Sequence, residues 1–361
     1  MLPYWFLFLI PAFWAVTRLK PVHCKELSVQ QERWSEVWRG IFIFLVLMVG
    51  LRHEVGGDWS AYIALLESYT ETTTADRLKF QDPAFVLFNW LAAQTGMGVY
   101  LINLLSAIFF SWGLVVFCQA QPRPWLALLV SVPYLITVVA MGYTRQGVAI
   151  GIAMVAMIAL GEGRSLRFML LIGFAALFHK SAIVLVPMAI LASTKQRLIT
   201  LAWVVVTGLI LYILLLQEAL SFLIYGYVDS QYQSSGAAIR VSMNALPAAL
   251  FLIFRKRFQL SPQQRSFWTW MSWSALLFIL LLIVSPSSTA VDRVALYWIP
   301  LQLFVMSRLP NALGQRVGKN AGLVYAGVAY CAVVHFVWLF FADTAFAWLP
   351  YQFYPWVWLW Q

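Results

Sequence analysis

The sequence predicts an all-α polytopic membrane protein. Of its 361 residues, 62% are hydrophobic and only 11% are charged, whereas soluble domains are about half apolar and about a quarter charged. Apolar runs separated by short polar segments recur along the whole chain. The basic residues that give a net charge of +10 are scattered between these runs. They therefore indicate membrane topology, and we expect no nucleic acid partner.

A span of about 20 apolar residues crosses the hydrocarbon core of a bilayer. The runs that we expect to cross are 3–17, 40–51, 98–118, 124–142, 146–160, 198–216, 244–254, 266–284, 294–307 and 321–341. The first run has neither a basic start nor a clear cleavage site, so it is interpreted as a span rather than a signal peptide. Residues 84–94 are too short to cross alone, and residues 168–192 form one long run that His179, Lys180 and Ser181 interrupt.

The basic residues resolve both stretches, because cytoplasmic loops carry the excess of Lys and Arg. The loops that we expect to be cytoplasmic contain Arg18, Lys20, Lys25, Arg33, Arg39, Arg164, Arg167, Arg255, Lys256, Arg257, Arg265, Arg308, Arg316 and Lys319. They can all lie inside only if 168–192 crosses twice, as a hairpin with His179 and Lys180 at its outer turn. The same parity makes 84–94 a re-entrant or surface half-helix on the outer side.

This topology gives about 12 crossings with both termini outside. It predicts a single integral membrane domain over residues 1–361. The outer loops 52–97 and 217–243, with the helix ends that carry the motifs, are expected to form the active-site face.

The most distinctive stretch is the segment from Leu51 to Tyr62, which directly follows an apolar run. It places Arg52, His53, Glu54 and Asp58 around Gly56 and Gly57. Ionisable groups are costly to place at a membrane boundary, so those that occur there more often serve a function than not. The plainer alternative is that the charges only mark where a span leaves the bilayer, but the glycine pair adds a tight backbone feature that a span end does not need.

Other polar motifs stand at predicted outer span ends, and span ends of one bundle can converge on a shared pocket. They are Asp82-Pro83, Tyr143 to Gln146, His179 to Ser181, Asp292-Arg293 and Tyr351-Gln352. Arg145 opens a span, where it is either an anion ligand at a helix N-terminus or an ordinary interfacial arginine. Arg293 follows Asp292, which leaves a structural ion pair as an equal alternative.

Proton acceptors for a hydroxyl group would be Asp58, Glu54, Asp82 or Asp292, or the imidazole of His179. Trp59 and Tyr62 could stack on sugar rings, although both residue types also populate membrane interfaces. The sequence lacks Asp-x-Asp, a Cys or His array, a Gly-rich phosphate loop and a serine nucleophile elbow. We therefore expect no metal and no cofactor. Cys24, Cys118 and Cys331 stand in unlike contexts and support no disulfide framework.

The segment Gly50-Leu51-Arg52-x-Glu54-Val55-Gly56-x-Asp58-Trp59-x-x-Tyr62 resembles the signature of the EpsG family of polysaccharide polymerases, the Wzy-like proteins of exopolysaccharide and O-antigen clusters. Further similarities follow in the family's order: Asp82-Pro83-x-Phe85, Arg145-Gln146, His179-Lys180-Ser181, Asp292-Arg293 with Tyr297, and Tyr351-Gln352. Asp82 departs from the pattern, in which a glutamate is expected, and Asp292 has no clear counterpart in it.

The resemblance implies a GT-C-like glycosyltransferase in the bacterial cytoplasmic membrane. It would join undecaprenyl-diphosphate-linked oligosaccharide repeat units on the outer face, with a chain-length regulator and a flippase as candidate partners. Arg52, Arg145 and Arg293, with Lys180, would bind the diphosphate, because guanidinium groups stay charged and bind two oxygens at once. Asp58, Glu54 or His179 would take the acceptor proton. The expected sugar-binding residues are Trp59, Tyr62, Asp82, Gln146 and Tyr351.

Three alternatives remain open. An O-antigen ligase, or another transferase that uses polyprenyl-phosphate sugars, would share these arginines and differ in its acceptor. A transporter of lipid-linked oligosaccharides should carry polar residues at the bilayer midplane and often a repeat, whereas the predicted spans are nearly free of charge. A membrane O-acyltransferase would be supported by His179 alone.

Overall fold

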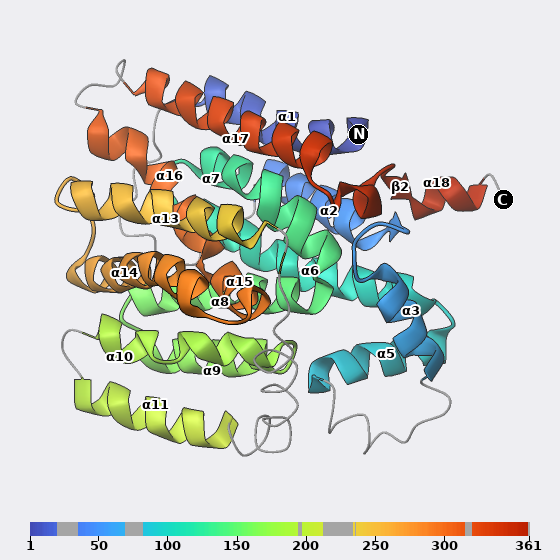
Figure 1. Cartoon of the computed structure of the whole chain (residues 1–361), viewed down its shortest axis with the longest axis horizontal. Helices are drawn as coiled ribbons and strands as arrows, with labels where there is room; N and C mark the ends of the chain where they lie inside the picture. Colours follow the sequence, from blue (N-terminus) through green and yellow to red (C-terminus); the bar gives the residue numbers. More distant parts are fainter. Residues whose placement is uncertain are drawn as a thin grey trace. The chain divides into compact units, whose positions relative to one another are not determined.

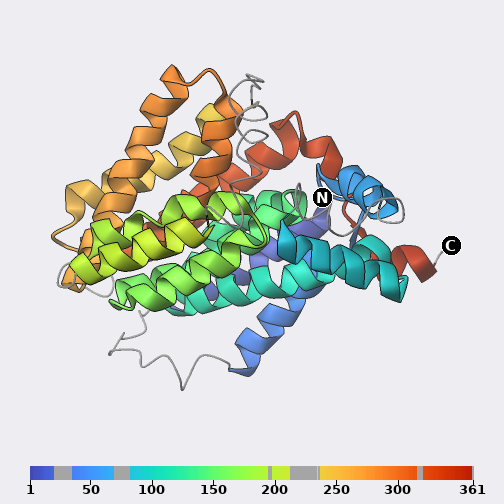
Figure 2. The ribbon, with the colours of Figure 1, turned by 90° about the horizontal axis from the view of Figure 1, so that it is seen from below.

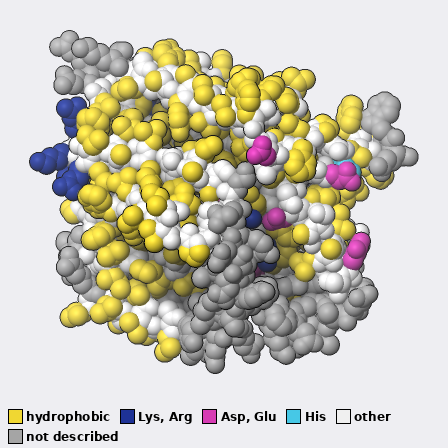
Figure 3. Space-filling model, viewed as in Figure 1, with side chains coloured by type: hydrophobic (Ala, Val, Ile, Leu, Met, Phe, Trp, Pro, Cys, Tyr) yellow, Lys and Arg dark blue, Asp and Glu magenta, His cyan; other side chains and the backbone are white. Residues whose placement is uncertain are grey.

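The computed structural model describes residues 1–19, 35–68, 82–193, 197–211, 234, 236–314 and 320–359. In these ranges the regular structure is helical except for one pair of two-residue strands. Five helices are long and apolar enough to cross a membrane: α6 (Gly98–Gln119), α8 (Thr144–Gly161), α13 (Ala237–Phe254), α14 (Pro262–Val284) and α17 (Ala321–Phe341). Hydrophobic side chains cover most of the described surface on the face in Figure 3. The all-α membrane class is confirmed, whereas about 12 crossings and a GT-C-like fold stay predictions.

The chain divides into two compact units, and α8 runs through the boundary between them. The first unit holds Met1–Gly151 and Arg316–Gln361, and the second holds Ile152–Gln315. The single membrane domain expected from the sequence stays a prediction.

The first unit is built around α6. Helices α2 (Glu36–Gly50), α3 (Trp59–Glu67) and α5 (Pro83–Thr95) all contact α6, while α1 (Leu2–Thr17) packs against α7 (Pro124–Ser131) and α17. The π-helix η2 (Val132–Ala140) continues α7. The chain ends in η8 (Ala345–Trp348), β2 (Gln352–Phe353) and α18 (Tyr354–Leu359). Strand β2 pairs antiparallel with β1 (Arg52–His53), so the last residues return to the motif near the start.

The second unit contains α9 (Ser165–Ala176), η3 (Lys180–Leu185), α10 (Met188–Ala192) and α11 (Arg197–Leu211), then α13, α14, α15 (Ser288–Ala295), η6 (Leu296–Trp298) and α16 (Ile299–Leu313). Helix α13 contacts α14, α15 and α16. Helix α9 contacts η3 and α10, and α11 lies beside them (Figures 1 and 2).

The two ambiguous stretches have the local form that parity required. Residues 168–192 fold back on themselves, because α9 ends at Ala176 and η3 starts at Lys180 and packs against it. Residues 84–94 lie within α5, a short helix that begins at Pro83 and ends before Gly96 in the left-handed conformation, with φ of 68°. A proline in the first turn and a left-handed glycine after the last are typical helix boundaries. How deep these two stretches lie in a membrane stays a prediction.

Helices α6 and α8 approach each other through glycines. A Cβ atom added to Gly113 would lie 1.9 Å from the carbonyl oxygen of Gly151, and one added to Gly151 would lie 2.7 Å from the Cα of Phe110. Both contacts are with backbone, which cannot move aside. Small residues allow such close packing between membrane helices, and here they fix the start of α8 against α6.

We expect Gly113→Ala to lower the free energy of unfolding by about 1–3 kcal/mol, the usual cost of overpacking. The matched control is Gly40→Ala in α2, where no atom lies within 4 Å of the added Cβ. That change should be neutral or stabilise by up to about 1 kcal/mol, because glycine is a poor helix former. Thermal unfolding of both variants in detergent measures the difference, and equal melting temperatures would contradict the close contact.

Candidate functional site

Arg52 is a buried hub rather than an exposed ligand. Its side chain, in β1, is 1% exposed. Its Nε donates to the carbonyl oxygen of Val55 at 3.1 Å, and its Nη2 donates to Asn103 Oδ1 and Thr144 Oγ1, both at 2.8 Å. Its Nη1 donates to the carbonyl oxygen of Val49. These four neutral oxygens join the end of α2, the motif loop, α6 and the start of α8.

Burial lowers the pKa of Arg52 to about 10, which leaves the guanidinium charged at neutral pH. A charge that is buried without an ion pair needs its hydrogen bonds complete, because each lost bond leaves a costly unpaired group. Arg52 is therefore placed to orient Thr144, the residue before Arg145.

The loop after Arg52 is held by close backbone contacts. Glu54 has a φ of 51° and Gly56 a φ of 108°. A Cβ atom on Gly56 would lie 2.1 Å from the carbonyl oxygen of Met141, and the Gly56 N–H donates to the carbonyl oxygen of Ala347 at 2.8 Å. Only glycine combines this φ with such an approach. The loop thus packs against the segment before α8 and is hydrogen-bonded to η8 near the C-terminus.

Arg145 lies at the centre of a polar cluster in the first unit. Its Nη1 is 3.2 Å from Asp82 Oδ2, and its backbone N–H donates to Tyr62 Oη at 3.4 Å. Asp58 lies within electrostatic range of Arg52, Tyr62 and Arg145. Burial, followed by the negative charge of Asp58, raises the pKa of Tyr62.

The two side chains of the ion pair differ in exposure. The Arg145 side chain is 37% exposed and that of Asp82 only 8%. The guanidinium also lies over the ring of Phe85, 5.6 Å from its centroid. Asp82, the N-cap residue of α5, therefore anchors one end of a cation whose other end reaches solvent.

Four aromatic rings gather beside the motif loop. His53 Nδ1 is 2.6 Å from the hydroxyl of Tyr100, and the ring of Tyr354 stacks on Tyr100 with 3.6 Å between centroids. Trp59 lies 5.9 Å from both His53 and Tyr100. All four side chains are half-buried.

In the second unit, His179, Ser181 and Tyr297 form a hydrogen-bonded row. Ser181 Oγ donates to Tyr297 Oη at 3.1 Å and lies 2.5 Å from His179 Nδ1. The imidazole of His179 is thus linked through the Ser181 hydroxyl to the phenol of Tyr297. Lys180, between them in the sequence, is half-buried and begins η3.

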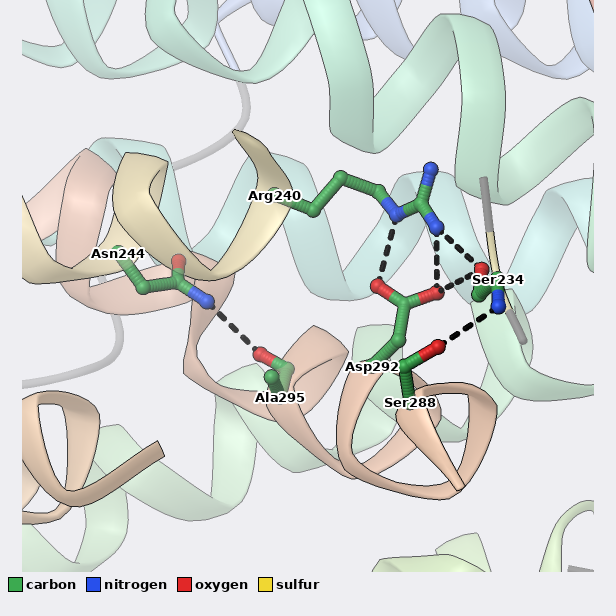
Figure 4. A network of polar contacts seen from close by, with 6 residues as sticks. All are labelled: Ser234, Arg240, Asn244, Ser288, Asp292 and Ala295. Carbon is green, nitrogen blue, oxygen red and sulfur yellow. Dashed lines mark hydrogen bonds and ion pairs between the residues drawn. The ribbon is translucent and has the colours of Figure 1, made fainter. Parts of the chain in front are cut away.

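Asp292 is held by Arg240 and not by its sequence neighbour Arg293 (Figure 4). Arg240 Nε and Nη2 donate to the two carboxylate oxygens at 2.7 and 2.8 Å, and Ser234 Oγ donates to Oδ2 at 3.1 Å. The carboxylate is thus committed to an ion pair and is poorly suited to accept a proton.

The segment from Ser288 to Trp298 is fixed at several points besides this ion pair. Asn244 Nδ2 donates to the carbonyl oxygen of Ala295 at 2.9 Å, and Trp298 Nε1 donates to Met271 O at 3.0 Å. Tyr297 accepts from Ser181. Arg293 lies on this segment and is half-buried. The contacts of the segment therefore fix the backbone position of Arg293.

The structure separates the predicted site residues into two groups. Those in the first unit are Arg52, Glu54, Asp58, Trp59, Tyr62, Asp82, Arg145, Gln146 and Tyr351, and those in the second are His179, Lys180 and Arg293. Tyr62 and Gln146 are buried, and the Tyr351 hydroxyl donates to the carbonyl oxygen of Met48 at 2.8 Å. The burial of Tyr62 and Gln146 and the hydrogen bond of the half-buried Tyr351 favour structural roles over sugar contacts. One pocket shared by both groups stays a prediction.

Sequence reasoning named Thr144 only as part of the motif from Tyr143 to Gln146, and it missed the other partners that complete these arrangements: Asn103, Tyr100, Tyr354 and Arg240. All stand near helix starts or in apolar helices and belong to no charged cluster. Among the described residues, no three His, Cys, Asp or Glu side chains come together as a metal-binding set. Independence from metal stays a prediction.

The model of the EpsG family matches residues 37–353. No curated protein and no solved structure matches the chain. The matched region includes every predicted site residue.

We expect Arg52→Lys to lower the free energy of unfolding by roughly 2–4 kcal/mol, because one ammonium cannot reach four acceptors that the guanidinium fork bonds at once. Arg145→Lys keeps the charge beside Asp82 and should change stability by less than about 1 kcal/mol. Denaturant titration of the two purified variants compares them. An Arg52→Lys protein as stable as the wild type would show that the hub is not structural.

Proposed function

Because the chain belongs to the EpsG family, whose members are polysaccharide-biosynthesis membrane proteins, we propose that it is a polysaccharide polymerase. In this proposal it is a glycosyltransferase that joins undecaprenyl-diphosphate-linked oligosaccharide repeat units at the outer face of the cytoplasmic membrane. One lipid-linked chain is the donor, and a second lipid-linked unit supplies the acceptor hydroxyl.

The observation that supports this proposal best is that the guanidinium of Arg145 forms an ion pair with Asp82 and is still partly exposed. A lipid diphosphate leaves with developing negative charge on its bridging oxygen, and a preorganised cation stabilises that charge. Arg145 is held on one side by Asp82 and is exposed on the other. It also lies in the first turn of α8, where the positive end of the helix dipole favours anions. Arginine can donate two parallel bonds to phosphate oxygens.

The other cations take different roles in the proposal. Arg52 is buried and bonded to four protein oxygens, so it positions the start of α8 instead of contacting substrate. Arg293 and Lys180 are half-buried and remain candidates for diphosphate contacts. In the proposal, guanidinium groups neutralise the negative charge that develops on the departing diphosphate, so the reaction needs no metal ion. This agrees with the expectation from the sequence.

Asp58 is our first candidate for the base. The acceptor hydroxyl oxygen would attack the anomeric carbon of the donor, the bond from that carbon to the diphosphate would break, and the hydroxyl proton would pass to the carboxylate. Asp58 is half-buried in the same cluster as Arg145. His179 is the alternative, because imidazole is the most common general base in enzymes and this one is half-buried beside Ser181 and Tyr297. Glu54 is exposed and less suited to hold a proton in place.

We expect Arg145→Ala to abolish polymer while lipid-linked single repeat units accumulate on the outer face. Gel analysis of polymer and mass spectrometry of extracted lipids, in a deletion strain complemented with each variant, measure both products. The control is Arg39→Ala, because Arg39 is an exposed arginine in α2 that pairs with Glu36, which is also exposed. It should leave chain length unchanged.

Three outcomes would contradict the polymerase. Normal polymer from a well-expressed Arg145→Ala protein would remove the diphosphate role. Repeat units trapped on the inner face would indicate a transporter. A wild-type product capped on another lipid by a single transfer would indicate a ligase.

Asp58→Asn should lower kcat by about 10²–10⁴-fold, the usual contribution of a general base, with little change in KM. His179→Gln should cost less. Turnover of a defined lipid-linked repeat unit by purified protein, with sizing of the product, separates the two variants. A large loss in His179→Gln beside near-normal Asp58→Asn would assign the base to the histidine instead.

A further inference from the structure

The four aromatic rings of His53, Trp59, Tyr100 and Tyr354, here named the aromatic platform, come from four separate segments. They lie in β1, at the start of α3, in the first turn of α6 and at the start of α18. The pairing of β1 with β2, and a hydrogen bond from the Tyr354 N–H to the carbonyl oxygen of Leu51 at 2.8 Å, bring the last of them into place.

The platform carries polar atoms that the described protein leaves unbonded. In the described ranges no hydrogen bond engages Trp59 Nε1, His53 Nε2 or Tyr354 Oη, and none of these atoms is buried. They therefore face solvent at the edges of rings whose other contacts are with one another. Half-exposed ring faces with a few outward polar atoms are the surfaces that bind carbohydrate-like ligands.

Glu54 adds a carboxylate to the platform. Its backbone has a φ of 51°, a left-handed conformation that is strained for a glutamate and often marks a functional position. The side chain is exposed, lies within electrostatic range of Tyr100 and has no hydrogen-bond partner among the described residues. A carboxylate can accept two hydroxyl hydrogen bonds, and such charge-assisted bonds are strong.

We propose that the platform and Glu54 form a binding subsite for the oligosaccharide portion of the substrate. Sugar rings pack their C–H faces on Trp59 and Tyr100, while Glu54, His53 Nε2 and Trp59 Nε1 bond their hydroxyl groups. This inference rests on the proposed function for the identity of the sugar chain, and it replaces the buried Tyr62 of the sequence prediction with Tyr100 and Tyr354.

A plain interfacial belt does not account for the arrangement. A tryptophan that only borders a membrane interface needs no fixed partner, and Trp358 in α18 is 65% exposed. The platform rings instead contact one another, and Tyr100 is bonded to His53 at 2.6 Å. Their geometry is fixed before any ligand arrives, which lowers the entropy cost of binding.

The test uses full-length protein in nanodiscs and lipid-free oligosaccharides, released by mild acid from the polymer of the native host and labelled at the reducing end. Fluorescence polarisation measures Kd, with empty nanodiscs as the blank. We expect Trp59→Ala to weaken binding about tenfold and Glu54→Gln about threefold. Because Glu54 is exposed, its variant tests the subsite without disturbing the core. The matched aromatic control, Trp358→Ala, should bind as the wild type does.

Wild-type affinity in both Trp59→Ala and Glu54→Gln would overturn the subsite, as would wild-type protein that binds no fragment. An equal loss in Trp358→Ala would also overturn it, since any interfacial tryptophan would then serve. Arg145→Ala separates this inference from the proposed function. It should bind lipid-free fragments normally while making no polymer, so a failed platform and a failed diphosphate site give different results.

Discussion

The arrangement of the first unit depends on one buried charge. The guanidinium of Arg52 joins α2, the motif loop, α6 and the start of α8 through four neutral oxygens. A lysine, with a single charged nitrogen, cannot bond four acceptors in different directions. Around it, Gly56 lets the loop touch the backbone before α8, and Gly142 leaves room for the ring of Trp348, which a Cβ atom would meet at 2.2 Å. The position of Arg145 follows from these contacts.

Two kinds of surface result from this interior. One is cationic, where Arg145 is tied to Asp82 with Asp58 close by. The other is aromatic and acidic, where the platform rings contact one another and Glu54 lies within electrostatic range of Tyr100. A lipid-linked sugar presents the same division, with a diphosphate at one end and neutral hydroxyl-rich rings beyond it. In the proposed function, the motif from Leu51 to Tyr62 supplies Arg52 to the scaffold, Asp58 to the charged cluster and Trp59 to the sugar subsite.

Much of the fold could be predicted from hydropathy, since the apolar runs coincide with helices wherever the structure describes them, and the basic residues required 168–192 to fold back. The family was also predictable, because the motif residues are charged in a chain that is otherwise poor in charge. The different roles of the arginines could not be predicted from the sequence. Arg52 and Arg145 look alike in sequence, and the structure distinguishes them because Asn103 and Thr144 accept hydrogen bonds from Arg52. Asp292 was similarly ambiguous, because its partner Arg240 is 52 residues away.

The central claim is that Arg145 faces the diphosphate while Arg52 serves the interior. Arginine-specific labelling with phenylglyoxal, followed by peptide mass spectrometry of the protein in nanodiscs, tests it directly. The account predicts that Arg145 is modified and is protected by a prenyl diphosphate, while Arg52 stays unmodified until the protein unfolds. Rapid modification of Arg52 that the prenyl diphosphate suppresses, with Arg145 unaffected by it, would contradict the account.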